Sequence, residues 1–448
     1  MAAALSAAPA DALARAYHRS LALRWLATVF ALPVLVPLLL ARGLDLSQVA
    51  LVMATFAAVT AVLEVPTGGM ADAFGRIRVT LIADALAIAA RIGLMLAPDL
   101  GGLVAAAALG GAARALGSGS LEAWYVDARR SRDAGEDLQR PLARAGTVQS
   151  LVLALGTLAG GALPLLAPLI GLADSGDVRA LSLAFAASIA VGIVSLVVTS
   201  RLSDTHVVAP AARRAARPDR VALVAVRALR RDPTIALLVL VGATIGGVIM
   251  GFETFLPAEL EARWGAAGVS TVLGVVMAVA FVATALGQAL AGRFPTRSVR
   301  APLARAVHGS LVMASGATIL ALGPGAPLQD GAITVARVAG VALAAGGAWV
   351  TYLGVGLAGP ALAAAFHSRV ASGERATLLS LRSFAAYAGG VAATLALGVS
   401  AEAAGLRVVW LAVAALGITA AVTMLAWRRD PAPSAPVVAD RPAHADGS

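Results

Sequence analysis

Long apolar runs separated by short polar segments dominate the sequence. About twelve runs approach the roughly 20 residues that a helix needs to cross a bilayer, and they lack the alternation over about ten residues that a membrane β-strand requires. In lipid, a helix is then the structure that satisfies the backbone hydrogen bonds. The expected spans are 20–41, 49–71, 79–97, 103–126, 148–170, 181–198, 235–257, 269–291, 303–322, 333–365, 378–399 and 408–426. The pattern therefore predicts an all-α membrane protein with twelve transmembrane helices.

The segment 201–233 interrupts this rhythm, because it contains eight arginines and no long apolar run. It separates six expected spans from six, which predicts two pseudo-symmetric six-helix bundles joined by an Arg-rich linker. The tail after the last span is rich in Pro and Ala, a composition typical of disorder. The expected organisation is an N-terminal segment (1–19), a first bundle (20–200), the linker (201–233), a second bundle (234–429) and the tail (430–448).

Composition excludes whole classes of protein. Hydrophobic residues make up 59% of the 448 residues and charged residues 13%, with a mean hydropathy of +0.85, whereas a soluble domain carries about 25% charged residues. A water-soluble enzyme is therefore excluded. The chain has no cysteine, and its five histidines form no pair at helical spacing, so we expect no metal site and no catalytic residues. Without lysine, the phosphate-binding loop G-x-x-x-x-G-K-[ST] is impossible, so we expect neither ATP-driven transport by this chain nor a cofactor.

The basic charge predicts the orientation in the membrane. All 35 basic residues are arginines, against 25 acidic residues, which gives a net charge of +10. If the spans alternate, most arginines fall on the side of the N-terminus. Because positively charged loops stay in the cytoplasm, we expect a multi-pass protein of the plasma (inner) membrane with both termini cytoplasmic. Charge spread over one membrane face also argues against nucleic-acid binding, and we expect a monomer.

The most specific motif lies between the second and third spans, where the sequence from 64 to 78 is EVPTGGMADAFGRIR. It resembles the loop signature of the major facilitator superfamily, G-x-x-x-D-[RK]-x-G-[RK]-[RK]. The matching positions are Gly68, Asp72, Gly75, Arg76 and, one place late, Arg78, while Ala73 replaces the usual basic residue. The resemblance implies two bundles that open alternately to the two sides of the membrane. The lead-in to the loop is most similar to the branch that exports drugs and secondary metabolites.

Two further motifs resemble the same superfamily. Arg114, followed by Gly117 and Gly119, resembles its span-four arginine motif with the glycine shifted. The antiporter motif of the fifth span is met only in part, because its glycines are present without a Gly-Pro pair.

The loop predicts a conformational latch. Asp72 is an anion suited to the positive end of a neighbouring helix, and the eleventh span begins nearby in a two-bundle arrangement. Arg76 can pair with Asp127 at the end of the fourth span, while Gly68 and Gly75 allow close approach and tight turning. We expect these five residues to hold the cytoplasmic side shut in the outward-open state. A plain positively charged loop is the alternative.

Ionisable residues inside spans are costly and usually mark a transport or proton pathway. Asp84 and Arg91 lie two turns apart on one helix face. Their charges neutralise each other, or are neutralised by charges on a neighbouring helix. Glu253, near Pro257, has no evident local partner, and a carboxyl group in apolar surroundings takes up protons more readily than one in water. The alternative for Glu253 is a vestibule residue without a special role. The candidates for the pathway are Glu64, Asp84, Arg91, Arg114, Glu122 and Glu253.

Two pairs of residues each have more than one interpretation. Glu64 and Glu122 lie toward the cytoplasmic third of their spans, where they belong either to the pathway or to the latch. Trp349 and Tyr352 lie in the middle of the tenth span beside several glycines. They line a cavity, or else they serve packing or face lipid.

Together these patterns predict a secondary active transporter that is not an enzyme. The expected function is proton-coupled efflux of a small amphipathic compound by alternating access, with the substrate, protons and the lipid bilayer as partners. One alternative is a proton-coupled importer or facilitator of a small metabolite such as a sugar or organic acid. A more distant one is a membrane receptor or scaffold that transports nothing.

Overall fold

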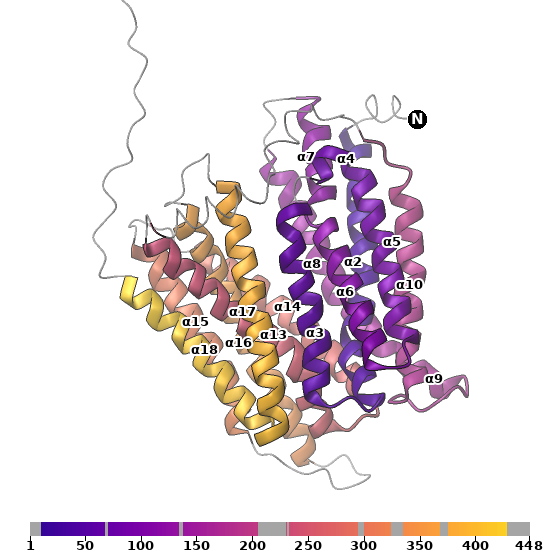
Figure 1. Cartoon of the computed structure of the whole chain (residues 1–448), viewed down its shortest axis with the longest axis vertical. Coiled ribbons are helices and arrows are strands. Elements are labelled where there is room, and N and C mark those ends of the chain that lie inside the picture. Colours follow the sequence, from indigo (N-terminus) through magenta and orange to yellow (C-terminus); the bar gives the residue numbers. More distant parts are fainter. Residues whose placement is uncertain are drawn as a thin grey trace, which may run out of the picture.

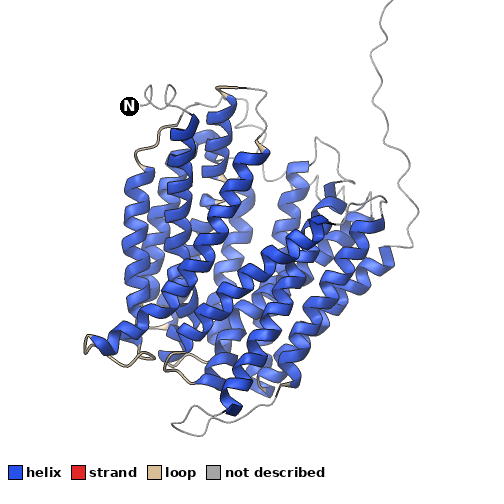
Figure 2. Cartoon of the chain, turned by 180° about the vertical axis from the view of Figure 1, so that it is seen from behind, coloured by secondary structure: helices blue, strands red, loops and turns tan. Residues whose placement is uncertain are grey.

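A computed structural model of the chain describes residues 10–67, 70–133, 138–204, 230, 233–293, 300–323, 335–367 and 375–427. The elements of this part of the chain are helices joined by loops and turns (Figure 2). The first bundle contains α2 (Ala10–Ala41), α3 (Leu46–Thr67), α4 (Met70–Phe74), α5 (Arg76–Leu96), α6 (Leu100–Gly117), α7 (Ser120–Arg130), α8 (Gln139–Ala162), η1 (Leu163–Leu165), α9 (Leu166–Leu169) and α10 (Val178–Thr199). The second bundle contains α13 (Pro233–Trp264), α14 (Val269–Arg293), α15 (Arg300–Leu322), α16 (Val335–His367), α17 (Arg375–Ala404) and α18 (Leu406–Trp427).

Twelve stretches among the described residues are long and apolar enough to cross a membrane, six in each bundle. The twelve-helix architecture expected from the apolar runs is thereby confirmed, and the bundles lie side by side (Figure 1). The exact limits of the expected domains stay predictions. Residues 1–9, the linker residues 205–229 and the tail 430–448 lie outside the described part of the chain.

The two ends of the bundles differ. We call the end at which α2 begins and α10 ends the linker face, and the other end the opposite face. Helix α3 packs against α17, and α8 against α14, so each bundle contributes two helices to the interface. At the opposite face the bundles meet, and toward the linker face they diverge (Figures 1 and 2).

The fourth span differs from the expectation of one continuous helix at 103–126. Helix α6 ends at Gly117 and α7 begins at Ser120. Gly119, between them, has a φ of +70°, which is readily adopted only by glycine. The Ser120 hydroxyl donates a hydrogen bond of 3.1 Å to the Leu116 carbonyl across the break. Glu122 therefore lies on a separate short helix at the linker face, where it is exposed.

Glycines allow the helices of the second bundle to touch through their backbones. A Cβ atom on Gly246 of α13 would lie 2.0 Å from the Ala386 carbonyl oxygen of α17, and one on Gly389 would lie 2.2 Å from the Ala243 carbonyl oxygen. Small residues at such contacts are what close helix packing in lipid requires.

Candidate functional site

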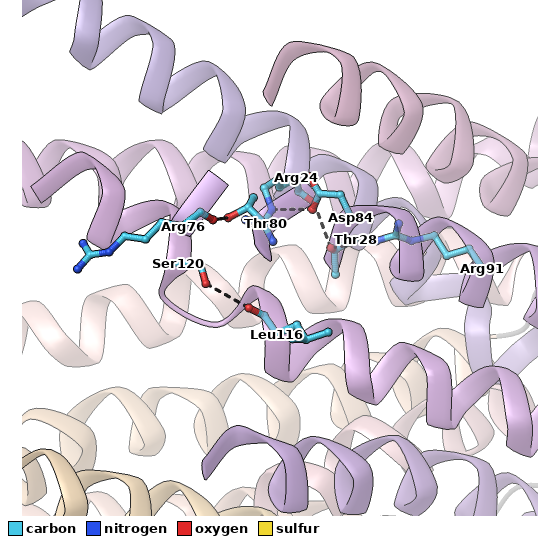
Figure 3. A network of polar contacts seen from close by, with 8 residues as sticks. All are labelled: Arg24, Thr28, Arg76, Thr80, Asp84, Arg91, Leu116 and Ser120. Carbon is cyan, nitrogen blue, oxygen red and sulfur yellow. Dashed lines mark hydrogen bonds and ion pairs between the residues drawn. The ribbon is translucent and has the colours of Figure 1, made fainter. Parts of the chain in front are cut away.

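A buried ion pair joins α2 and α5 inside the first bundle. The Arg24 Nε atom lies 2.9 Å from Asp84 Oδ1, with side chains that are 19% and 10% exposed. Gly117 leaves space for this pair, because a Cβ atom there would lie 2.6 Å from an Arg24 guanidinium nitrogen. Figure 3 shows Arg24, Asp84 and their polar neighbours. The sequence identifies Asp84 as a candidate but not Arg24, although a single arginine within the first expected span was the signal for it.

Arg91 takes a different partner. Its guanidinium donates a hydrogen bond of 3.3 Å to the Thr28 hydroxyl of α2 (Figure 3). Its positive charge still acts on Asp84, together with that of Arg24. Of the two alternatives for Asp84, the structure favours neutralisation by a neighbouring helix. One carboxylate thus lies between two arginines.

Arg114 lies at the boundary between the bundles. Its guanidinium carbon lies 5.8 Å from the centre of the Trp25 ring, and its charge acts on Glu64. The charge of Arg114 also acts on Tyr387 of α17 in the second bundle. Arg114 is exposed, but these partners place it between the bundles and not against lipid.

Glu253 of α13 has no ion pair and no hydrogen bond among the described residues. The charge of Glu253 acts on two tyrosines, Tyr352 on α16 and Tyr387 on α17. The Tyr352 hydroxyl has no hydrogen-bond partner within the described part of the chain. Glu253 therefore presents an unneutralised carboxyl group inside the membrane-spanning region, which is costly and typical of a functional residue.

These side chains form a continuous series across both bundles, which we call the central polar set: Arg24, Glu64, Asp84, Arg91, Arg114, Glu253 and Tyr387. At 1.5 Å per helical residue, Glu253, Arg114 and Tyr387 lie about 16, 21 and 26 Å from the helix ends at the opposite face. A bilayer core is about 30 Å thick, so these three residues lie within its thickness, and Glu253 is nearest the middle. Glu64 Oε2 and Asp84 Oδ2 are buried, and neither oxygen has a partner among the described residues. The set is equipped to bind a polar group and to exchange protons.

Trp349 and Tyr352 of α16 differ in what their side chains contact. The Trp349 indole donates a hydrogen bond of 3.0 Å to the Val276 carbonyl, which ties α16 to α14. Tyr352 is 6% exposed and packs edge-on against Phe252, with ring centres 6.4 Å apart. Tyr352 is thus next to Glu253, while the polar edge of Trp349 is used in packing. Among the described residues, His, Cys, Asp and Glu side chains form no group that could hold a metal ion.

The candidate latch residues lie at the linker face. Arg76 Nη1 and Asp127 Oδ2 form an ion pair of 2.8 Å between α5 and α7. Gly75 precedes α5 with a φ of +99°, which suits glycine alone. Gly68 lies outside the described residues, as does the side chain of Asp72 on α4. Glu122 was expected to belong either to the pathway or to the latch. It lies apart from the central polar set, at the same face as the latch residues.

Asp204 belongs to this face as well, although the sequence does not single it out. Its Oδ1 accepts a hydrogen bond of 2.8 Å from the Ile77 backbone N–H in the first turn of α5. A Cβ atom on Gly75 would lie 2.4 Å from Asp204 Oδ2. The beginning of the linker is thereby fixed against the signature loop. An aspartate shortly after the sixth expected span, at the start of the linker, was the available signal.

Replacing Arg24 with Gln is expected to lower the free energy of unfolding by on the order of 3 kcal/mol, because it leaves Asp84 with one fewer compensating charge in a buried site. The double variant Arg24→Gln/Asp84→Asn is expected to recover part of this loss. Thermal unfolding in detergent measures both. Arg19→Gln, at an exposed position on the same helix, is the control, and equal losses in Arg24→Gln and Arg19→Gln would contradict a stabilising pair.

Comparison with known proteins agrees with this architecture. The family model described as Major Facilitator Superfamily matches residues 20–354. A variant of the nucleoside transporter NupG has a similar crystal structure, with a TM-score of 0.73, 13% identity and coverage of 92% of this chain and 99% of that chain. A POT family transporter in complex with 5-aminolevulinic acid gives a TM-score of 0.69, 12% identity and coverage of 93% and 96%. At such identities the likeness concerns the fold alone.

No curated protein matches the sequence significantly. The family model nevertheless covers more than half of the chain, and the twelve spans in two bundles are the expected architecture. The chain is a multi-pass membrane protein and a transporter, not an enzyme, and it belongs to the major facilitator superfamily.

Proposed function

We propose that the protein is a proton-coupled secondary transporter that exports a small amphipathic compound across the plasma membrane. The linker face is cytoplasmic in this proposal, as the arginine distribution requires. The observation that carries the proposal is the central polar set, above all the unpaired carboxyl group of Glu253. Charges inside a membrane protein mark ion and substrate pathways, whereas a receptor or scaffold has no need of them.

In the proposed cycle Glu253 carries the proton. A carboxyl group without an ion-pair partner is neutral when it binds a proton and charged when it releases one, so its protonation state can change with the side to which the site is open. Arg114 and Glu64, on the other bundle, bind the polar part of the substrate. Moving one charge through 100 mV supplies about 2.3 kcal/mol, which is enough for roughly a fifty-fold gradient of a neutral substrate.

The latch residues act at the linker face. The Arg76–Asp127 pair joins α5 to α7 within the first bundle and so holds the signature loop in place. Asp72 then reaches the N-terminus of α17 when the bundles approach each other at this face. The described arrangement, with bundles that diverge at the linker face, corresponds in this proposal to the state open to the cytoplasm.

Accumulation of fluorescent dyes tests the proposal. Cells that lack their main efflux pumps are loaded with ethidium or Hoechst 33342, with and without expression of the protein. We expect lower dye retention on expression, and restored retention after addition of a protonophore. If dye retention stays low with the protonophore, proton coupling is contradicted. If expression leaves dye retention unchanged, dye efflux is contradicted.

A second candidate is uptake of a polar metabolite. The nucleoside and peptide transporters that share the fold favour it, as does the number of charged groups in the central polar set. Uptake of labelled nucleosides or dipeptides that rises on expression, together with unchanged dye retention, would support import over export.

A further inference from the structure

A hydrogen bond joins the two bundles at the opposite face. Glu402, close to the end of α17, accepts a hydrogen bond of 2.6 Å from the backbone N–H of Leu46, the first residue of α3. The first N–H groups of a helix have no acceptor within that helix, and the helix dipole favours an anion beside them. Glu402 of the second bundle thus caps a helix of the first bundle.

Helix α3 also has a cap of its own. Asp45 Oδ1 accepts hydrogen bonds from the Gln48 backbone N–H at 2.8 Å and the Ser47 hydroxyl at 2.6 Å. These hydrogen bonds hold the pKa of the Asp45 carboxyl below its usual range, so it stays charged at neutral pH. Asp45 moves with α3, whereas Glu402 moves with the other bundle. Only the Glu402 contact therefore depends on the relative position of the bundles.

The Glu402 contact lies at the end of a tight interface. A Cβ atom on Gly398, one turn before Glu402, would lie 2.6 Å from Ala50 Cβ and 3.2 Å from Ser47 Cα. Ala50 is fully buried and clusters with apolar residues of the second bundle, Leu397 among them. The backbones of α3 and α17 thus touch, and Glu402 cannot reach Leu46 once this interface has opened.

The other interface repeats the arrangement. The hydroxyls of Ser270 and Thr271, at the start of α14, donate hydrogen bonds of 3.3 and 2.8 Å to the Gly161 carbonyl near the end of α8. If the bundles are exchanged, the second span α3 corresponds to the eighth span α14, and the fifth span α8 to the eleventh span α17. Each interface therefore sets the start of one helix against the end of its partner. Of the contacts described at these two helix ends, the α3–α17 contact uses a carboxylate and the α14–α8 contact uses hydroxyl groups.

We propose that Glu402 is a positioning residue of the transport cycle, which holds the opposite face closed by capping α3 and releases that helix when the face opens. The proposal rests on alternating access, as the proposed function does. Glu402 caps α3 at the opposite face in the state in which that face is closed, and the cap is absent in the state in which it is open.

The absence of cysteine from the chain permits a direct test. Ala41→Cys and Arg407→Cys place one exposed label on each bundle at the opposite face, and double electron–electron resonance in lipid nanodiscs gives the distance distribution between them. We expect mainly the short distance in the otherwise unchanged protein. Glu402→Ala should raise the ratio of long to short distances about five-fold, and Glu402→Gln, which keeps a hydrogen-bond acceptor without the charge, should raise it less.

Asp99→Ala is the matched control. Asp99 caps α6 of its own bundle at the same face, where it accepts a hydrogen bond of 2.8 Å from the Gly102 N–H, and its loss should leave the distances unchanged. A distribution unaltered by Glu402→Ala, or altered equally by Asp99→Ala, would overturn the proposal. This readout needs neither dye nor proton gradient. A protein that fails the dye assay but shows the five-fold shift therefore loses the efflux assignment and keeps the role of Glu402.

Discussion

In a Glu253→Gln variant, the proton-driven dye gradient is expected to be at least ten-fold smaller than in the unaltered protein. Glutamine has nearly the shape of glutamate, so the packing around Tyr352 and Phe252 is retained, but it neither binds nor releases a proton. A transporter altered in this way still exchanges substrate down its gradient, because that movement needs no proton transfer. Dye efflux in energised cells, compared with counterflow of dye in proteoliposomes without a pH gradient, separates the two effects.

Glu261→Gln is the control for this variant. Glu261 lies on the same helix, two turns closer to the opposite face, and outside the central polar set. Its replacement should leave the gradient within about two-fold of the unaltered protein. A Glu253→Gln variant that is present at equal levels in the membrane and drives an unchanged gradient would show that another group carries the proton.

A substantial loss of stability is expected from Gly246→Ala. The new Cβ atom would lie 2.0 Å from the Ala386 carbonyl oxygen, so α13 and α17 must move apart along their whole contact. Overpacking in a close-packed interior costs about 1–3 kcal/mol, and backbone atoms give way less readily than side chains. We expect a clear fall in the melting temperature of the purified protein, and reduced amounts in the membrane.

Gly346→Ala is the matched substitution in the same bundle. A Cβ atom at Gly346 would meet no atom within 4 Å, and alanine is favoured over glycine within a helix by about 1 kcal/mol. The melting temperature should therefore stay the same or rise. Equal falls in both variants would mean that the backbone contact at Gly246 contributes little to stability.

The sequence predicts the fold well because the length of an apolar run is itself a physical constraint. A span such as 181–198 needs no partner to be recognised, and the helix α10 (Val178–Thr199) extends only slightly beyond it. The break at Gly119 was harder to predict, since a glycine inside an apolar run is tolerated in most helices. Its positive φ depends on the packing of α7 at the linker face.

The partners of the charged residues were predicted less completely, because they come from distant parts of the chain. Asp84 and Arg91 stand on one helix face, yet Asp84 pairs with Arg24, which is sixty positions away. Arg76 and Asp127 were easier to match, since both follow directly from the order of the spans. Glu402 gave no signal at all: it lies outside the apolar run of its span, and only the meeting of α3 with α17 gives it a partner.

The glycine contacts at the opposite face have a mechanical consequence. Gly161 meets Gly274 and Gly398 meets Ala50, so the helix backbones approach each other there through small residues. Small residues have few or no rotamers to rearrange when such contacts separate. The opposite face can therefore be closed by close backbone packing and still open without repacking the side chains at these contacts, as repeated alternation between two states requires.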